Sequence, residues 1–410
     1  METAAAPGSG VADVELAALE SAIRDAEPAF LADFERLVNV DCGSYTPEGV
    51  DEIGRFIAGF LSDLGADVEA RPDPSGRFGS TIVGRLRGAA GSPRVVLIGH
   101  MDTVFDPGTA AARPFRIDDD GRAYGPGVSD MKGGLLAGLY AVRALAGAGP
   151  LPFERLTFVA NPDEEVGSLS STPHITELAA DADACLVLEC ARANGDIVSS
   201  RKGIVDARIT VHGRAAHAGV EPEKGRSAIL AAADLVGRLH ELNGRWDGVT
   251  VNVGVVSGGT RPNVVPERCE LQVDVRAVQR ADLEAVEGEI RSLLETLSVP
   301  ETTADFGEMA RWWPMEKLER SGRLVEHATA LAGRLGFPLA DTSTGGASDA
   351  NTTSGMGIPS LDGLGPIGGN DHSPGEYLEV ASIVPRTTLV AALLLAIARD
   401  PVVLGWRGGA

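Results

Sequence analysis

The sequence contains few cysteines. Cys42, Cys185, Cys190 and Cys269 are the only four in 410 residues, and they form no C-x-x-C pair. A chain of this length needs no covalent cross-links, so a disulfide-stabilised mini-protein is excluded. We expect reduced cysteines and a cytoplasmic protein.

Positive charge is scarce as well. The chain has 36 Lys and Arg against 58 Asp and Glu, for a net charge of −22, and only four of the basic residues are Lys. A surface of this sign repels nucleic-acid phosphates and anionic lipid, so we expect neither nucleic acid nor a membrane surface as a partner. The excess of acids is compatible with carboxylates gathered around cations.

Long apolar runs are also missing. The longest, Leu389–Ala398, is too short to span a bilayer. The first ten residues, METAAAPGSG, have no basic region followed by an apolar stretch, so we expect no signal peptide. The composition, with 44% hydrophobic residues, is that of a globular protein, and the length predicts two domains.

The first half of the chain alternates helical and strand-like patterns. Residues 11–38 and 48–65 have the apolar spacing of amphipathic helices. Residues 94–99 (RVVLIG), 156–160 and 184–188 are short apolar runs, which are typical of strands buried on both faces. This pattern predicts an α/β domain in which a mostly parallel or mixed sheet is flanked by helices.

From about residue 203 the pattern changes to strict alternation. Val205, Ala207, Ile209 and Val211 fall on one side of a strand whose other side is polar, which indicates a sheet with one solvated face. The elements that follow have the order β-α-β-β-α-β of a ferredoxin-like α+β domain. They are predicted at residues 204–211, 226–242, 249–257, 269–277, 281–297 and 302–308.

We therefore predict a domain inserted into a larger one. The inserted domain covers residues 203–312, and the larger domain consists of residues 1–202 and 313–410. The larger domain ends on a helix at residues 383–399.

Acidic and imidazole side chains follow several of the predicted strands. His100 and Asp102 come directly after RVVLIG, Glu164 and Glu165 follow the strand at 156–160, and Glu189 ends the strand at 184–188. Ligands in open α/β sheets bind beyond the carboxyl ends of the strands. His100 and Asp102 share a face of extended chain, as in sites where a carboxylate orients a metal-binding histidine.

Two further residues of this kind lie in loops. Asp130 follows a glycine-rich turn, and His372 lies in GNDHS. Each feature has a simpler explanation, because Asp130 suits a helix N-cap and Glu164-Glu165 suits a solvated loop. Together, however, these groups repel one another unless cations neutralise them. Mixed histidine and carboxylate ligands suit Zn²⁺, with Mn²⁺ or Co²⁺ as substitutes.

Seven segments also match a known family in order and spacing. They are GHMDTV, GPGVSDMKGG, NPDEEVGS, LVLE, HGRAAHAGVEPEKGRSA, GGASDAN and GNDHSPGEY. They resemble the M20 metallopeptidases, in particular the glutamate carboxypeptidase (carboxypeptidase G) branch, from about residue 30 to 400. The resemblance implies a di-zinc hydrolase with a catalytic domain and an inserted dimerisation or lid domain.

The resemblance also assigns roles at the metal site. The ligands implied for one zinc are His100, Asp130 and Glu189. Those implied for the other are Asp130, Glu165 and His372. Asp102 is implied to orient His100, and Glu164 to act as the general base that moves a proton from water to the leaving nitrogen. The peptide bond after Asp130 is implied to be cis.

Further roles are implied for the lid domain. His217 matches a histidine that reaches the partner subunit's active site in a homodimer. Arg276 and Asn263 match positions that hold a substrate carboxylate, although Arg276 has Asp274 as an alternative partner. Gly345 and Gly346 are expected to offer backbone N–H donors. Lys202 is either a further anion-binding residue or a plain surface lysine.

These assignments leave several functions open. We favour hydrolysis of an amide next to a free carboxylate, in a small peptide or an N-acyl amino acid, with C-terminal glutamate as the preferred substrate. The alternatives within the fold are an acetylornithine- or succinyl-diaminopimelate-type deacylase, a dipeptidase and a carbamoylase. A non-catalytic binding protein of the same family is a more distant alternative.

Overall fold

The computed structural model describes residues 10–408, and within this range the chain divides into two compact units. Unit 1 consists of the residues up to Ser199, Lys317–Ser343 and the residues from Ser348 onward. Unit 2 consists of Ser200–Glu316 together with Thr344–Ala347. The sequence predicted an insertion at 203–312, so the main difference is the short segment at 344–347.

Hydrogen bonds within unit 2, from one backbone N–H and one arginine side chain, explain this additional segment. The Lys202 N–H donates to the Thr344 carbonyl at 3.1 Å. The Arg201 guanidinium donates to the carbonyl oxygens of Gly346 and Ala347 at 3.2 and 3.4 Å. A contact between segments more than 140 residues apart leaves no local pattern in the sequence.

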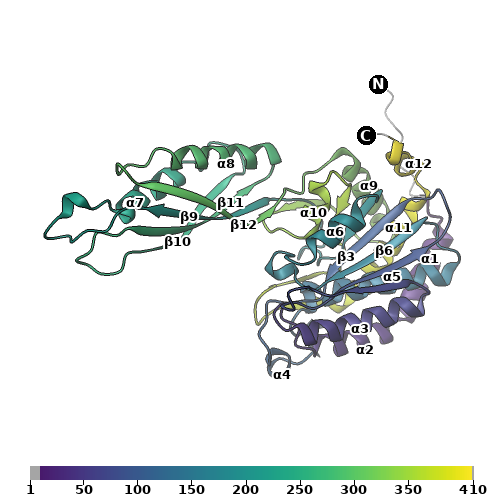
Figure 1. Ribbon diagram of the computed structural model, residues 1–410. Coiled ribbons are helices and arrows are strands. Elements are labelled where there is room, and N and C mark those ends of the chain that lie inside the picture. Colours follow the sequence, from purple (N-terminus) through teal and green to yellow (C-terminus); the bar gives the residue numbers. More distant parts are fainter. Residues whose placement is uncertain (1–9, 409–410) are drawn as a thin grey trace. The chain divides into compact units, whose positions relative to one another are not determined.

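Unit 1 is built on a six-stranded mixed sheet, as predicted (Figure 1). Its strand order is β1-β2-β6-β3-β7-β14, in which β6, β3, β7 and β14 pair in parallel and β2 is antiparallel to both of its neighbours, β1 and β6. The strands are β1 (Asp67–Arg71), β2 (Thr81–Arg87), β3 (Arg94–His100), β6 (Arg155–Asn161), β7 (Ala184–Val187) and β14 (Ser360–Leu361). The central strands β3, β6 and β7 are buried along nearly their whole length, because helices cover both faces.

The helices of unit 1 flank this sheet. Figure 1 shows α6 and α10 on one side and α3 and α5 on the other. The helices are α1 (Asp13–Asp25), α2 (Glu27–Val38), α3 (Pro47–Asp63), α4 (Thr109–Ala112), α5 (Gly133–Ala148), α6 (Thr172–Ala179), α9 (Glu319–Arg334), α10 (Asp349–Gly355), α11 (Ile383–Arg399) and α12 (Pro401–Leu404). The single helix expected at 11–38 is two helices, because Pro28 lies in the first turn of α2, where its missing N–H costs nothing.

Helix α11 is the most apolar element of unit 1. With the turn before it, Val380–Arg399 is long and apolar enough to cross a membrane by length and composition alone. The structure buries 83% of that segment, and α11 contacts α1, α5 and α9. These contacts make α11 a core helix of unit 1.

A small second sheet lies in the same unit. It has the order β15-β16-β5-β4, and all its pairings are antiparallel. Its strands are β4 (Arg116–Ile117), β5 (Arg122–Tyr124), β15 (Gly368–Gly369) and β16 (Tyr377–Glu379). Two further strands, β8 (Ile197–Arg201) and β13 (Asp341–Thr344), lie where the chain passes between units.

Unit 2 has the predicted β-α-β-β-α-β order. Its elements are β9 (Gly203–His212), α7 (Ala228–His240), β10 (Thr250–Gly258), β11 (Arg268–Ala277), α8 (Arg280–Leu294) and β12 (Thr303–Trp312). The strands form one antiparallel sheet in the order β10-β11-β9-β12, the ferredoxin-like arrangement. Alternate residues of β9 and β11 are buried against α7 and α8, which confirms the one-sided pattern read from the sequence.

Candidate metal centre

The predicted metal ligands of unit 1 gather at the carboxyl ends of its parallel strands. His100 is the last residue of β3 and lies level with Asn161, the last residue of β6. Glu164 and Glu165 follow β6 within four residues, and Glu189 follows the end of β7 by two. Parallel strands end at the same sheet edge, so these side chains converge.

The first cluster joins His100, Asp130 and Glu189. His100 Nε2 lies 3.0 Å from Asp130 Oδ1 and 3.7 Å from Glu189 Oε1. The other ring nitrogen, Nδ1, lies 3.0 Å from the backbone carbonyl oxygen of Asp102 and 3.3 Å from Oδ1 of the Asp102 side chain. Burial alone lowers the pKa of His100, but Asp102 and Asp130 outweigh it and raise that pKa well above the ordinary value.

The second cluster joins Asp130, Glu165 and His372. His372 Nε2 lies 3.1 Å from Asp130 Oδ2 and 3.0 Å from Glu165 Oε2. These two carboxylates raise the pKa of His372 to about 11. Asp130 belongs to both clusters and uses a different oxygen for each, as expected of a bridging ligand.

The turn that presents Asp130 is fixed by a buried glutamate. Glu376 Oε1 accepts the N–H groups of Ser129 and Asp130 at 2.8 and 3.1 Å, and its Oε2 accepts that of Gly127 at 3.0 Å. The peptide bond between Asp130 and Met131 is cis, as the family resemblance implied. Every N–H that Glu376 accepts comes from the four residues ending at Asp130, so Glu376 sets the position of the shared ligand.

The same turn is also tied down by Lys132. Its ammonium is fully buried and donates to the carbonyls of Pro126, Val40 and Val38 at 3.0, 3.1 and 3.4 Å. A buried ammonium must be satisfied in this way, because an unpaired one is costly.

Asp102 fixes the turn that carries Glu164 and Glu165. Its two carboxylate oxygens accept the N–H groups of Glu164 and Glu165 at 3.1 and 3.2 Å, and Ser44 Oγ donates to Oδ2 at 2.6 Å. Asp102 therefore orients both His100 and this turn.

Glu164 and Glu165 differ in their surroundings. The carboxylate of Glu165 lies in the second cluster, whereas that of Glu164 is in neither. Burial raises the pKa of Glu164 well above the ordinary value, and the nearby carboxylates of Glu189 and Asp349 add to this effect. A carboxyl group with a raised pKa is suited to accept and return a proton.

The chemistry of the site fits divalent cations. Glu165 Oε1 is buried, and the structure gives it no hydrogen-bond partner. Four carboxylates, those of Asp102, Asp130, Glu165 and Glu189, lie close together around two imidazoles, and they repel one another strongly without cations. Two sets of histidine and carboxylate donors suit Zn²⁺ or a similar transition metal.

The predicted substrate-binding residues of the inserted domain belong to unit 2. His217 and Asn263 are both exposed. Their segments are paired, since the Ala218 N–H donates to the Asn263 carbonyl at 3.0 Å and His217 bridges to Val264. Lys202 is half-buried in the same unit.

Arg276 contacts one other residue of that predicted set. Its Nη1 donates to the Gly345 carbonyl at 2.8 Å, and Gly346 follows in the same segment. Its Nε and Nη2 donate to the Asp274 carboxylate at 3.0–3.1 Å, which is the alternative pairing that the sequence left open. The side chain of Arg276 remains 35% exposed, so part of the guanidinium faces solvent.

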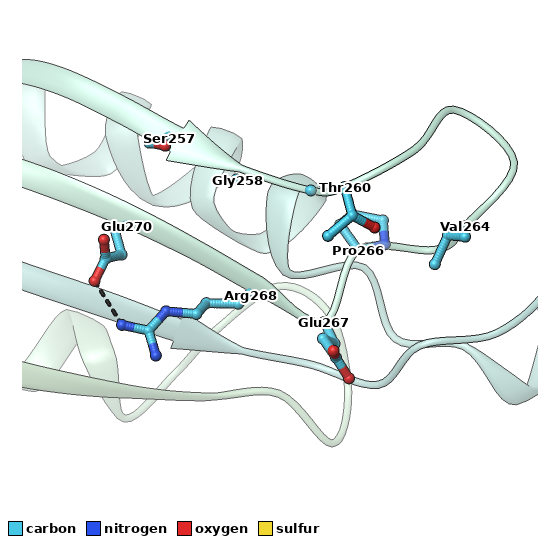
Figure 2. Close-up of a pocket in the computed structure, with 9 residues that line it drawn as sticks. Ser257, Gly258, Thr260, Val264, Pro266, Glu267, Arg268 and Glu270 are labelled. Atoms are coloured by element: carbon cyan, nitrogen blue, oxygen red, sulfur yellow. Dashed lines mark hydrogen bonds and ion pairs between the residues drawn. The ribbon is translucent and has the colours of Figure 1, made fainter.

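Figure 2 shows a pocket of unit 2, and none of its lining residues is one of the clustered ligands. It lies between the end of β10 and the chain that returns through Val264 and Pro266 into β11. Arg268 pairs with Glu270 at its side, at 2.6 Å. No histidine is among the described residues that line it, and we assign no chemistry to it.

Three buried polar residues near the clusters were not predicted, namely Glu376, Lys132 and Asp349. They lie in the recognised segments GNDHSPGEY, GPGVSDMKGG and GGASDAN. A charged residue in a recognised motif is therefore the signal that could have found them. Their hydrogen-bond partners are distant in sequence or are backbone atoms, and these the sequence does not reveal.

An α/β sheet whose strand ends present two histidine–carboxylate clusters with a shared aspartate defines a metal-dependent hydrolase. Comparison with known proteins agrees with this class. The model of peptidase family M20/M25/M40 matches residues 96–396. The chain belongs to this family, whose enzymes are metal-dependent, and it is a metallohydrolase.

Individual relatives cover nearly the whole chain. Carboxypeptidase G2 from Pseudomonas sp. (strain RS-16) is 31% identical over 399 residues, which cover 96% of this chain and 95% of that protein. Succinyl-diaminopimelate desuccinylase from Xanthomonas campestris pv. campestris (strain 8004) is 28% identical over 325 residues, 74% of this chain and 84% of that protein. A tripeptidase structure from Staphylococcus aureus subsp. aureus Mu50 has a TM-score of 0.76 at 22% identity and covers 91% of this chain and 99% of its own, which shows the shared fold.

Proposed function

We propose that this metallohydrolase binds two zinc ions per subunit and cleaves an amide bond next to a free carboxylate. The observation that carries the proposal is the different placement of the neighbouring residues Glu164 and Glu165. Glu165 lies in a ligand cluster, whereas Glu164, whose pKa is raised, lies outside both. This arrangement supports a base that stays free to move protons beside a metal pair.

The five clustered ligands and Glu164 each have a role in this mechanism. His100, Asp130 and Glu189 would hold one ion, and Asp130, Glu165 and His372 would hold the other. When bound, such ions polarise a carbonyl oxygen and lower the pKa of a water molecule. Glu164 accepts the proton of the water whose oxygen bonds to the amide carbon. It then delivers that proton to the nitrogen as the carbon–nitrogen bond breaks.

The proposed substrate is a small peptide or N-acyl amino acid with a C-terminal carboxylate, preferably glutamate. The 31% identity to a carboxypeptidase and the segment HAGVEPEKGRSA support this choice. Arg276 and Asn263 bind the carboxylate, and the backbone of Gly345 and Gly346 and the side chain of Lys202 contribute to its pocket. A substrate carboxylate has to share Arg276 with Asp274.

We further propose a cytoplasmic homodimer formed through unit 2. In this arrangement His217 serves the partner's active site, where it donates to the oxyanion that develops on the carbonyl. The exposure of His217 is compatible with this role, and four unpaired, buried cysteines support a reducing compartment.

A desuccinylase-type deacylase is the second candidate, because the Xanthomonas desuccinylase is 28% identical over most of the chain. The test is metal analysis of the purified protein together with a substrate panel. The panel holds N-benzoyl-L-glutamate, N-acetylornithine, N-succinyl-diaminopimelate, an N-carbamoyl amino acid and dipeptides.

We expect two zinc ions per chain, fastest hydrolysis of benzoyl-glutamate, loss of activity with a chelator and recovery with Zn²⁺. Fastest hydrolysis of another panel member reassigns the substrate. Full activity after complete metal removal refutes the mechanism.

A further inference from the structure

A buried carboxylate behind the metal centre has no role in the mechanism above. Asp349 is 1% exposed and is the first residue of α10. Its Oδ2 accepts a hydrogen bond from Asn161 Nδ2 at 2.6 Å, and its Oδ1 accepts one from Ser168 Oγ at 2.7 Å. Asp349 belongs to neither ligand cluster.

Both donors lie at the ends of one turn. Asn161 is the last residue of β6, and Ser168 closes the turn by donating its N–H to the Asp163 carbonyl at 2.8 Å. Glu164 and Glu165 lie between them. Asp349 is 188 and 181 residues away from these donors in sequence, so it holds the turn from outside.

Two carboxylates therefore hold the turn, one at its centre and one at its ends. Asp102 accepts the backbone N–H groups of Glu164 and Glu165, and Asp349 accepts side-chain donors at the two ends. Bonds of 2.6 and 2.7 Å at the two ends restrict the turn in addition to the backbone bonds at its centre.

Ionisation of Asp349 is costly where the side chain lies. Burial raises its pKa to about 7, although the bond from Ser168 acts in the opposite direction. A neutral residue of the same shape avoids this cost, and a carboxylate is therefore better explained by the geometry that its two oxygens impose.

We propose that Asp349 is a positioning residue, which fixes the carboxylate of Glu164 for proton transfer by holding both ends of its turn. The proposal rests on the proposed function, in which Glu164 is the base. Displacing a catalytic group by about 1 Å can cost about 100-fold in rate, so a loosened turn lowers kcat.

The chain offers a matched control for the central experiment. Asp362 is also fully buried, and its Oδ2 accepts the hydroxyl of Ser348, the residue that caps α10, at 2.6 Å. Asp349→Asn and Asp362→Asn therefore each replace a buried carboxyl group next to the start of one helix. The first carboxyl group accepts hydrogen bonds from both ends of the turn with Glu164, and the second accepts one from the residue before α10.

We expect Asp349→Asn, in the zinc-loaded enzyme, to lower kcat by about 10- to 100-fold. KM for the panel substrate hydrolysed fastest and the zinc content should both stay within about twofold of the parent. Asp362→Asn should keep kcat within about threefold even where it lowers the melting temperature as much. Equal kcat losses in the two variants, or an unchanged kcat in Asp349→Asn, overturn the proposal. Zinc loss that parallels the loss of kcat overturns it too.

Two further measurements keep the proposal testable if Asp349→Asn folds poorly or no panel substrate is cleaved. Ser168→Ala removes one donor and leaves the carboxylate, and it should lower kcat less than Asp349→Asn with the same unchanged KM. Hydrogen exchange of the peptide 161–171, read by mass spectrometry, should be faster in Ser168→Ala and in Asp349→Asn but not in Asp362→Asn. Unchanged exchange in both variants refutes the holding role without reference to activity.

Failure of the proposed function has a different signature. Glu164→Gln is measured in the same assay and should be nearly inactive. A fully active Glu164→Gln refutes Glu164 as the base, whatever Asp349→Asn does. An inactive Glu164→Gln beside a normal Asp349→Asn refutes only the positioning role.

Discussion

Asp400 joins the C-terminal end of α11 to α9, and its removal should destabilise unit 1 in a pH-dependent way. Its Oδ2 lies 2.5 Å from Arg323 Nε and 2.7 Å from His327 Nε2. Its Oδ1 accepts the N–H of Val402 at 2.9 Å, which caps α12. The Asp400 carboxylate is only 2% exposed, and His327 is equally buried, so replacing Asp400 by Asn leaves a buried histidine without its charged partner.

The magnitude follows from the pKa of Asp400. Burial acts to raise that pKa, but the bonds from Arg323 and His327 outweigh it and lower the pKa from the ordinary 3.8 to about 2. A group whose pKa is lower in the folded than in the unfolded state stabilises the fold above the unfolded value and loses this contribution as the pH falls toward the folded value. The shift corresponds to about 2 kcal/mol of unfolding free energy, present at pH 7 and about halved at pH 3.

Urea unfolding followed by circular dichroism tests this at both pH values. Asp400→Asn should lower the unfolding free energy by at least about 2 kcal/mol at pH 7, and its deficit should shrink by about 1 kcal/mol at pH 3. Comparing variant with parent at each pH cancels the acid-driven loss of metal. Asp13→Asn is the matched control, since Asp13 pairs with Arg334 but is 94% exposed, and it should cost less than about 1 kcal/mol. A deficit for Asp400→Asn that does not change with pH refutes the reasoning.

Three further predictions concern the site. Glu164→Gln should keep its zinc and lose about 100- to 10,000-fold in turnover, whereas Glu165→Gln should lose both turnover and zinc. Metal analysis that finds equal zinc loss in the two variants contradicts the division of roles. Arg276→Ala should cost roughly 2–5 kcal/mol in kcat/KM for a substrate with a free carboxylate and much less for its amide, and equal losses leave Arg276 structural. His217→Ala and Glu164→Gln homodimers should each be nearly inactive. Mixed dimers, made by co-expression, should regain activity, because the subunit with an intact Glu164 receives His217 from its partner. No recovery in verified mixed dimers refutes action across the interface.

Much of the architecture was predictable because local patterns determine it. The apolar runs at β3, β6 and β7 indicated buried parallel strands, and the alternation at β9 indicated a one-sided sheet. The edge strand β1 was not predicted, because its sequence DVEAR is mostly polar and its residues stay partly exposed.

The metal ligands could be predicted from local sequence patterns, whereas the residues that position them could not. His100 and Glu189 directly follow strand patterns, so elementary rules of sheet topology bring them together. The supports Glu376 and Asp349 act through contacts with residues about 180–250 positions away, and only the folded chain shows them. Thr344–Ala347 joins unit 2 for the same reason.

The discontinuity of unit 1 has a consequence for biosynthesis. Four of the five clustered ligands precede unit 2 in the chain, but His372 and the core helix α11 follow it. Glu189 and His372 are 183 residues apart, so at about 5–20 residues per second the ribosome makes the last ligand roughly 10–40 s after the fourth. During that interval the nascent first half displays an incomplete acidic cluster and the uncovered apolar faces of α1 and α5. Unit 2, which is continuous from Ser200 to Glu316, has emerged almost completely by then. The ligand set of unit 1 is therefore completed only by a segment that the ribosome makes after the continuous part of unit 2.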